Sequence, residues 1–295
     1  MAYQRYNSSP LTMQELQLAV PSAFAQSQHV SRSQRYAFIP TFEVIAGLMR
    51  AGFQCYKATE QRVRLSNAGR RGFQKHMLRF RHADMQMTNV GDIRPEVILI
   101  NSSDGSSTYD LMAGLFRLAC LNGMVISEQE FAALKVRHTG DAVREVVAGS
   151  QAVLEGSKRA LIAVRDWSNL QLTNGEQHAF AEAAFGLRFV NDEGEVTTPI
   201  TPDQLLQPRR RDDVGNSLWL TFNRVQEHLV KGGDHGVDRT NGRRRNVTSR
   251  PVNGIDGDVK LNRSLWVLAT KLADLKKATD GIQDTVPFTD GVVIE

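Results

Sequence analysis

Cysteine is scarce in this sequence. Its 295 residues include two cysteines, Cys55 and Cys120, too few for a disulfide framework or a four-cysteine metal site in a chain of this length. Because such a content is typical of a reducing compartment, we expect a cytoplasmic protein in which both thiols are buried. Long hydrophobic runs are missing as well: residues 97–100 form one of the longest, far short of the roughly 20 residues that a membrane-spanning helix needs. We therefore expect no membrane span and no secretory signal.

Signatures of catalysis are also missing. The sequence contains no Gly-Lys-Ser/Thr phosphate loop, no HExxH zinc helix and no GxSxG nucleophile elbow. His76 and His82 stand about 20 Å apart along a predicted strand, too far to bind one metal ion. Trp167, Trp219 and Trp266 lie on the apolar sides of predicted helices, which favours core packing over ligand stacking. We expect a protein without enzymatic activity, metal or cofactor; an active site assembled from distant residues is the least favoured alternative.

Charge is distributed unevenly along the chain. The formal net charge is +4, but residues 31–82 contain eleven basic residues and two acidic ones, whereas residues 83–130 contain seven acidic residues and two basic ones. Residues 205–250 are basic again, with ten cations and five acids. Arginine provides 27 of the 36 basic residues, and its planar fork suits phosphate contacts. The clustering favours a phosphate-bearing partner, and a GC-rich genome with a solvated surface is the alternative.

The N-terminal half predicts a helix, three strands and a second helix. Residues 41–51 place apolar side chains on one helical face and end at Gly52. Residues 109–121 again show apolar side chains at helical spacing before Asn122 and Gly123. The predicted strands between them are residues 54–65, 75–82 and 95–101, separated by polar and glycine-containing stretches. This spacing is typical of an antiparallel meander.

The C-terminal half predicts mainly helices. A further strand is expected within residues 128–138. Residues 141–170 repeat apolar side chains at a period near 3.5 and predict a long helix. The other predicted helices are residues 175–187, a segment that starts at Asp212 or Asp213 and ends at Lys231, and residues 263–278 capped by Asn262.

These elements predict an α+β fold. It combines an antiparallel three-stranded meander flanked by helices with a mainly helical C-terminal half. We expect a polar N-terminal arm over residues 1–34 with a short helix at 12–20, an α+β core over 35–190, and a helical region over 191–295. Within the last, the Gly/Arg-rich loop 233–259 has few large apolar residues, so we expect it to be mobile until a partner orders it.

Two groups of side chains are candidates for binding nucleic acid. Alternation along the second predicted strand places Arg79 and Arg81 on one face, and if this strand pairs with the first as a hairpin, an arginine ladder beside Tyr56 would follow a phosphate backbone. The alternative is a solvated sheet face whose cations pair with the acidic segment. The candidates of the hairpin and its turn are Tyr56, Arg62, Arg64, Arg70, Arg71, Lys75, Arg79 and Arg81. The candidates of the loop are Arg239, Arg243, Arg244, Arg245 and Arg250. Arg209, Arg210 and Arg211 precede two aspartates, which favours local salt bridges.

Five segments of the chain resemble a known family. They are SQRYAFIPTFEVIAGLMRAGF at 33–53, HMLRFRH at 76–82, residues 95–126, SLWLTFNRVQEHLVKGG at 217–233 and GIDGDVKLNRSLWVLA at 254–269. Together they resemble the phage- and plasmid-borne family known as domain of unknown function 932. The resemblance implies a mobile-element origin and supplies no catalytic residues. The predicted order of helix, three strands and helix is also similar to the core of single-strand annealing proteins such as lambda Red beta, a likeness of fold alone.

The leading expectation is a homo-oligomeric, non-enzymatic protein that binds single-stranded DNA and promotes annealing or protection of the strand. The alternative is a host-interaction or anti-defence protein that acts through protein contacts of the acidic segment and the helical half. Salt dependence separates the two, because each phosphate contact to a single strand contributes about −0.7 to the log-log slope of affinity against salt.

Overall fold

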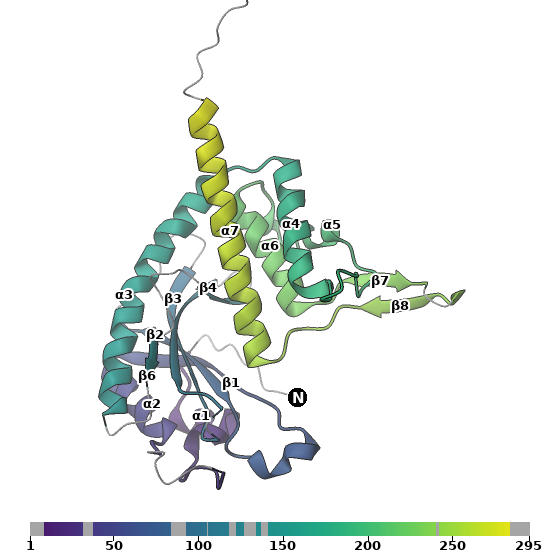
Figure 1. Cartoon of the computed structure of the whole chain (residues 1–295). Coiled ribbons are helices and arrows are strands. Elements are labelled where there is room, and N and C mark those ends of the chain that lie inside the picture. Colours follow the sequence, from purple (N-terminus) through teal and green to yellow (C-terminus); the bar gives the residue numbers. More distant parts are fainter. Residues whose placement is uncertain are drawn as a thin grey trace, which may run out of the picture.

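The computed structural model describes residues 9–31, 38–83, 93–104, 106–117, 122–126, 134–136, 141–239 and 242–283. It is an α+β protein with an antiparallel sheet and a mainly helical C-terminal half (Figure 1). The N-terminal elements are α1 (Met13–Ala19), η1 (Pro21–Phe24), α2 (Thr41–Arg50), β1 (Phe53–Glu60), η2 (Leu65–Arg70), β2 (His76–His82), β3 (Ile93–Asn101), β4 (Tyr109–Arg117), β5 (Asn122–Val125) and β6 (Leu134–Val136). None of the helices in these described ranges is long and apolar enough to cross a membrane.

The sheet is an antiparallel meander in the order β1-β2-β3-β4-β5. β5 and β6 both pair with β4: β5 pairs with residues 114–117, and β6 pairs with residues 109–111. The three predicted strands are confirmed as β1, β2 and β3, with β1 ending at Glu60. The β1–β2 hairpin is confirmed too, and its register pairs Lys57 with Arg79. A bulge between Cys55 and Lys57 interrupts the pairing, and Cys55 is fully buried as expected. Cys120 lies outside the described residues.

The predicted helix at residues 109–121 is wrong. Residues 109–117 form β4, which pairs with β3 along its whole length, from Ile100 opposite Asp110 to Ile93 opposite Arg117. Eight of the nine residues of β4 are buried, and a strand that is buried on both faces has an apolar run that periodicity cannot separate from a buried helix. The helix that follows the meander is α3 (Ala142–Asn169), so the predicted order of helix, three strands and helix, on which the likeness to the annealing-protein core rested, is wrong.

Alternation along β2 divides the sheet into two faces. Leu78 and Phe80 face α2, the start of α3 and the N-terminal segment, and they belong to one apolar core. Met77, with Ile98 and Ile100 of β3, faces the start of α7 (Ile255–Gln283) and forms a smaller cluster there. The described part of the predicted N-terminal arm belongs to the first core: Leu11, Leu16, Val20 and Ala23 are buried in it. The predicted arm therefore packs on the sheet from residue 11 to residue 23.

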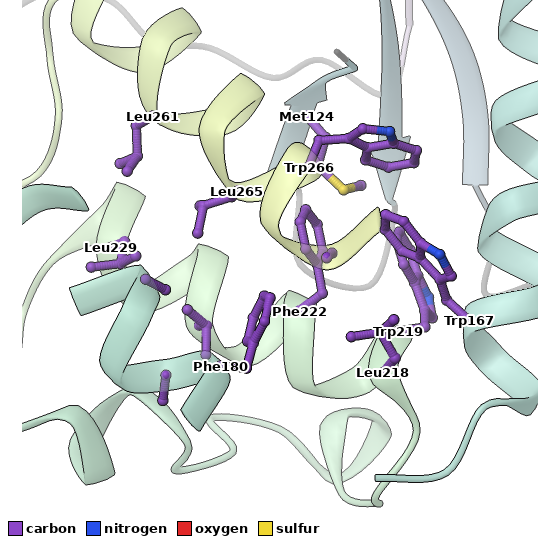
Figure 2. Packing of buried hydrophobic residues seen from close by; sticks show 14 of the residues in the cluster. Met124, Trp167, Phe180, Leu218, Trp219, Phe222, Leu229, Leu261, Leu265 and Trp266 are labelled. Carbon is purple, nitrogen blue, oxygen red and sulfur yellow. The ribbon is translucent and has the colours of Figure 1, made fainter. Parts of the chain in front are cut away.

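The helical half packs around a cluster of aromatic side chains. Its elements are α3, α4 (Asn174–Phe189), α5 (Pro202–Leu205), η4 (Arg211–Asp213), α6 (Leu218–Lys231), β7 (His235–Asp238), β8 (Arg245–Thr248) and α7. Figure 2 shows Trp167, Trp219, Phe222 and Trp266 together, and the rings of Trp167 and Trp266 are 4.5 Å apart. The prediction that the tryptophans are core anchors is confirmed. Full burial of each large apolar side chain stabilises the fold by about 1.5–3 kcal/mol.

Three boundaries differ from the predictions. Ser217 caps α6, because its side chain accepts from the Leu220 amide, and Asp213 belongs to the preceding 3-10 turn. α7 begins at Ile255, so Asn262 lies inside the helix and donates to the Asp258 carbonyl.

The apolar core that contains Trp167 also includes Leu115 of β4 and Leu229 of α6. The predicted division at residue 191 therefore does not separate two hydrophobic cores.

Residues 233–259 are not a featureless loop. They contain the β7–β8 hairpin, whose register pairs His235 with Thr248 and Asp238 with Arg245. Figure 1 shows this hairpin projecting away from α4, α6 and α7. The prediction of a loop ordered only by a partner is wrong for these strands, because composition alone does not report the backbone pairing that stabilises them.

Candidate nucleic-acid interface

The predicted arginine ladder is not a solvent-facing surface. Arg79 and Arg81 do share a sheet face as predicted, but their exposed fractions are 1% and 5%. Both pair with one carboxylate of β3: Arg79 Nη1 lies 3.2 Å from Glu96 Oε2, and Arg81 Nε lies 3.0 Å from Oε1. The guanidinium of Arg81 also stacks between the rings of Tyr56 and Phe116, 4.2 and 4.1 Å from their centroids. Arg79 and Arg81 are therefore buried rather than exposed as the predicted ladder requires, and Tyr56 is partly buried beside Arg81.

The cause of this burial is the start of α7, which covers this face. Ile255 and Val259 pack against the apolar cluster that contains Met77. Asp258 Oδ2 lies 3.7 Å from Arg79 Nη2, so the helix adds a carboxylate as well as an apolar cover. Burial and the charge of Arg79 lower the pKa of Lys57 to about 8 from 10.5. The charged residues of this face thus belong to a buried network.

The cations of the β1–β2 connection surround a hollow on the surface. Arg62, Arg64 and Arg70 line it together with Lys75 and Asp256, and its volume is about 350 Å³. These three arginines are exposed. The connection includes the 3-10 turn η2, and η2 ends at Arg70. The predicted candidates Arg62, Arg64, Arg70 and Lys75 therefore lie together, whereas Arg71 is exposed beside them and does not line the hollow.

A second hollow adjoins the first, because Lys75 and Asp256 line both. It lies over the edge of the sheet and the first turns of α7, and its volume is about 380 Å³. Lys135, Lys260 and Arg263 add three cations to it. We call the two hollows the basic groove. Its charged lining residues are Arg62, Arg64, Arg70, Lys75, Lys135, Lys260, Arg263, Asp104, Asp110 and Asp256.

The acidic side chains of the basic groove are held by specific partners. Lys75 Nζ lies 2.8 Å from Asp256 Oδ1 and 3.0 Å from Oδ2. Burial alone would raise the pKa of Asp104, but hydrogen bonds from Ser106 and Ser102, with the charge of Arg70 at 3.7 Å, hold this pKa below its usual value. Asp104 therefore stays ionised and orients Arg70. The seven cations exceed the three carboxylates, which leaves a net positive surface.

Sequence reasoning missed three cations of the basic groove. Lys260 and Arg263 are three residues apart on α7, a spacing that places both on one helix face. This spacing could have predicted from the sequence that Lys260 and Arg263 lie together. No sequence pattern identified Lys135, because only the pairing of β6 with β4 brings it beside Asp110.

The second predicted group lies on the β7–β8 hairpin. Arg239, Arg243, Arg244 and Arg245 are exposed at its tip and along β8, and Arg250 is exposed at its base. The structure thus separates the predicted candidates into three places: a buried network, the basic groove and this hairpin. The start of α7 connects the last two, since it follows the hairpin in the chain and pairs with Lys75 through Asp256.

The predicted local salt bridge after α5 is confirmed for Arg210, which pairs with Asp213 at 2.9 Å and also with Glu227. Arg209 pairs instead with Asp234, which is distant in the chain, at 3.0 Å. His76 hydrogen-bonds with Ser22 and Thr41, whereas His82 lies against the Ala51 carbonyl. Across the residues that the structure describes, no three histidine, cysteine or carboxylate side chains gather as a metal site would require.

The fold and the basic groove define an α+β protein with an antiparallel sheet, a helical half and a cationic surface hollow where they meet. The family model described as Domain of unknown function (DUF932) matches residues 28–266, and the chain belongs to this family. It is similar to the UPF0380 proteins YafZ and YfjQ of Escherichia coli (strain K12), with 45% and 44% identity over 263 residues. The match covers 89% of this chain and 92% of each relative. No solved structure matches the chain.

Proposed function

We propose that this protein binds single-stranded DNA in the basic groove. The observation that carries the proposal is the excess of cations over carboxylates around two adjoining hollows. Positive grooves that follow a phosphate backbone are a common way to hold a single strand without sequence preference. A hollow of this size accepts backbone units of one strand, whereas a duplex is too wide to enter it.

The rest of the expected function is part of the same proposal. Binding by many copies along one strand would protect it or bring complementary strands together, which is the expected role of a homo-oligomer in annealing. A phage or plasmid origin and action in a bacterial cytoplasm come from the family resemblance. The opposing expectation, a protein partner for the acidic segment, has less support from the acids that the structure describes: Glu96 and Asp104 are buried, and Asp110 lines the basic groove.

The test is fluorescence anisotropy with a labelled oligothymidylate at two salt concentrations. Replacing Arg62, Arg64 and Arg70 by alanine removes three exposed cations of the basic groove. If all three contact phosphate, the log-log slope of affinity against salt becomes less steep by about 2, at about 0.7 per contact. The matched control is Arg144→Ala, which removes an arginine that is 80% exposed on α3.

Two results would refute this function. One is wild-type affinity that does not change with salt. The other is a triple variant that binds the oligothymidylate as tightly as the Arg144→Ala control. A protein recovered from host lysate at one-to-one stoichiometry after nuclease treatment would favour the protein-partner alternative instead.

A further inference from the structure

The β7–β8 hairpin is a two-stranded ribbon with its own cationic surface. We call the described residues 235–239 and 242–248 the basic arm. The two strands pair antiparallel from His235 opposite Thr248 to Asp238 opposite Arg245. Figure 1 shows that the ribbon leaves the helical half and does not lie on the sheet. It is therefore a surface distinct from the basic groove.

The base of the basic arm is fixed by a buried polar network. Asp234, which is 7% exposed, accepts from Arg209 Nη2 at 3.0 Å and from His228 Nδ1. Its backbone amide donates to Ser249 Oγ at 2.9 Å, and the Ser249 amide donates to the Asp234 carbonyl at 2.8 Å. Burial alone would raise the pKa of Asp234, but the hydrogen bond and charge of His228, with Arg209, hold it below its usual value. The carboxylate therefore stays charged and joins both ends of the ribbon to α6.

Two further contacts hold β7 against Pro199 and against α5. A Cβ on Gly236 would lie 2.7 Å from the Pro199 carbonyl oxygen, so glycine allows this close approach. Gln204 Nε2 donates to the His235 carbonyl at 2.8 Å. An isolated two-stranded hairpin is marginally stable in water, and these contacts give the basic arm a fixed direction that such a hairpin lacks.

The far end of the basic arm is cationic and has little apolar surface. Arg239, Arg243 and Arg244 are exposed, and within the described residues none of the three forms an ion pair with a carboxylate. Arg245 is exposed on β8. The larger apolar side chains of the two strands are Val237 and Val247, both partly buried. Four exposed arginines beside so little apolar surface favour a polyanion over an apolar protein surface as the partner.

From this shape and charge we infer that the basic arm enters the major groove of duplex DNA. Two paired strands lie about 4.8 Å apart, and the major groove of B-DNA, about 12 Å wide, admits a two-stranded ribbon without deformation of the duplex, whereas the minor groove, about 6 Å wide, must be widened by bending the DNA before it can take one. The deep, narrow major groove of duplex RNA excludes it too. Arginine forks suit both phosphates and the O6 and N7 atoms of guanine. The inference goes beyond the proposed function, because it concerns a second surface and a duplex.

The first experiment compares nucleic acids and variants. Anisotropy is measured with the full chain on a DNA duplex, an RNA duplex of the same sequence and a single DNA strand. The arm variant replaces Arg243, Arg244 and Arg245 by alanine, and the matched groove variant replaces Arg62, Arg64 and Arg70. We expect the arm variant to bind the DNA duplex about tenfold to a hundredfold more weakly and the single strand with near wild-type affinity. We expect the groove variant to do the reverse.

The second experiment identifies the groove that is occupied. A DNA duplex whose cytosines carry glucosylated 5-hydroxymethyl groups has a filled major groove, and netropsin fills the minor groove of a normal duplex. Glucosylation is expected to prevent arm-dependent binding, and netropsin is expected to leave it unchanged. Circular dichroism and thermal melting of the arm variant test whether its three substitutions leave the fold intact, which we expect because all three side chains are exposed.

Three results would overturn the inference. In the first, the arm variant melts like the wild type and binds the DNA duplex with wild-type affinity. In the second, the arm variant loses the same affinity for the single strand as for the duplex. In the third, netropsin prevents binding of the duplex and glucosylation does not. The proposed function fails separately. If the groove variant keeps full affinity for the single strand while the arm variant loses the duplex, the basic arm is supported and the basic groove is not.

Discussion

Arg81 on β2 donates through Nε to Glu96 on β3, with 3.0 Å between Nε and Oε1. The same carboxylate also accepts from Arg79, so one buried acid is shared by two buried guanidinium groups. Asp258 Oδ2 lies 3.7 Å from Arg79 Nη2 and adds a second carboxylate, so the arginines of a face that alternation alone describes as basic are paired inside the folded protein.

Glu96→Ala is expected to destabilise the protein strongly. It leaves Arg79 and Arg81 buried beside each other without their shared carboxylate, and breaking a buried ion pair from one side costs about 3–5 kcal/mol. The free energy of unfolding from a urea titration measures this loss. Glu182→Ala removes an exposed carboxylate on α4 and is expected to change stability by less than about 0.5 kcal/mol. Equal stability of the two variants would contradict the role given to Glu96.

Acid is expected to weaken the fold through His76. This side chain is fully buried, with Nδ1 3.0 Å from Ser22 Oγ and Nε2 3.2 Å from Thr41 Oγ1. Burial lowers the pKa of His76 to about 4 from 6.5, against the opposing effects of the Gln74 carbonyl and Asp104. Between these two pH values the unfolded chain binds a proton that the folded protein does not. Stability therefore falls as pH falls from 6.5 to 4, by up to about 3 kcal/mol.

The measurement is the free energy of unfolding across this pH range for the wild type and for His76→Gln. The stability of the wild type relative to the variant is expected to fall as the pH is lowered, because the variant has no imidazole to protonate. His235→Gln, at an exposed histidine of the basic arm, is the control and is expected to follow the wild type. Parallel curves for wild type and His76→Gln would show that another group causes the acid sensitivity.

Local sequence patterns predicted much of the fold, but they failed where an element depends on residues that are distant in the chain. β1, β2 and β3 were predictable because polar stretches bound them, and α3 because its apolar period continues over 28 residues. β4 was not, because it is central in the sheet and its side chains are buried on both faces, Leu111 in one apolar cluster and Met112 in another. The basic groove was predicted in part. The cations of the β1–β2 connection were identified, but Asp256, which pairs with Lys75, was not, because it lies 181 residues further along the chain.

Trp266→Ala is expected to be among the most destabilising single changes in the helical half. Trp266 is fully buried against Trp167 and Phe222, and truncating a buried aromatic side chain to alanine costs about 3–5 kcal/mol. Val267 is next to it on α7 and is 43% exposed, so Val267→Ala is expected to cost about 0.5 kcal/mol or less. Urea titrations monitored by far-ultraviolet circular dichroism compare the two. A small loss for Trp266→Ala would mean that the cluster in Figure 2 repacks around the gap.

Asp256→Asn is expected to tighten binding of single-stranded DNA, the opposite of what removal of a groove arginine does. Asp256 is 70% exposed and holds Lys75 Nζ through both carboxylate oxygens, so it competes with a phosphate for that ammonium group. Without its charge, Lys75 gains one phosphate contact, and the log-log salt slope becomes steeper by about 0.7. Asp274→Asn changes an exposed aspartate near the other end of α7 and is the matched control for net charge. If both variants tighten binding equally, the gain is a general effect of charge, and the basic groove is not where the strand binds.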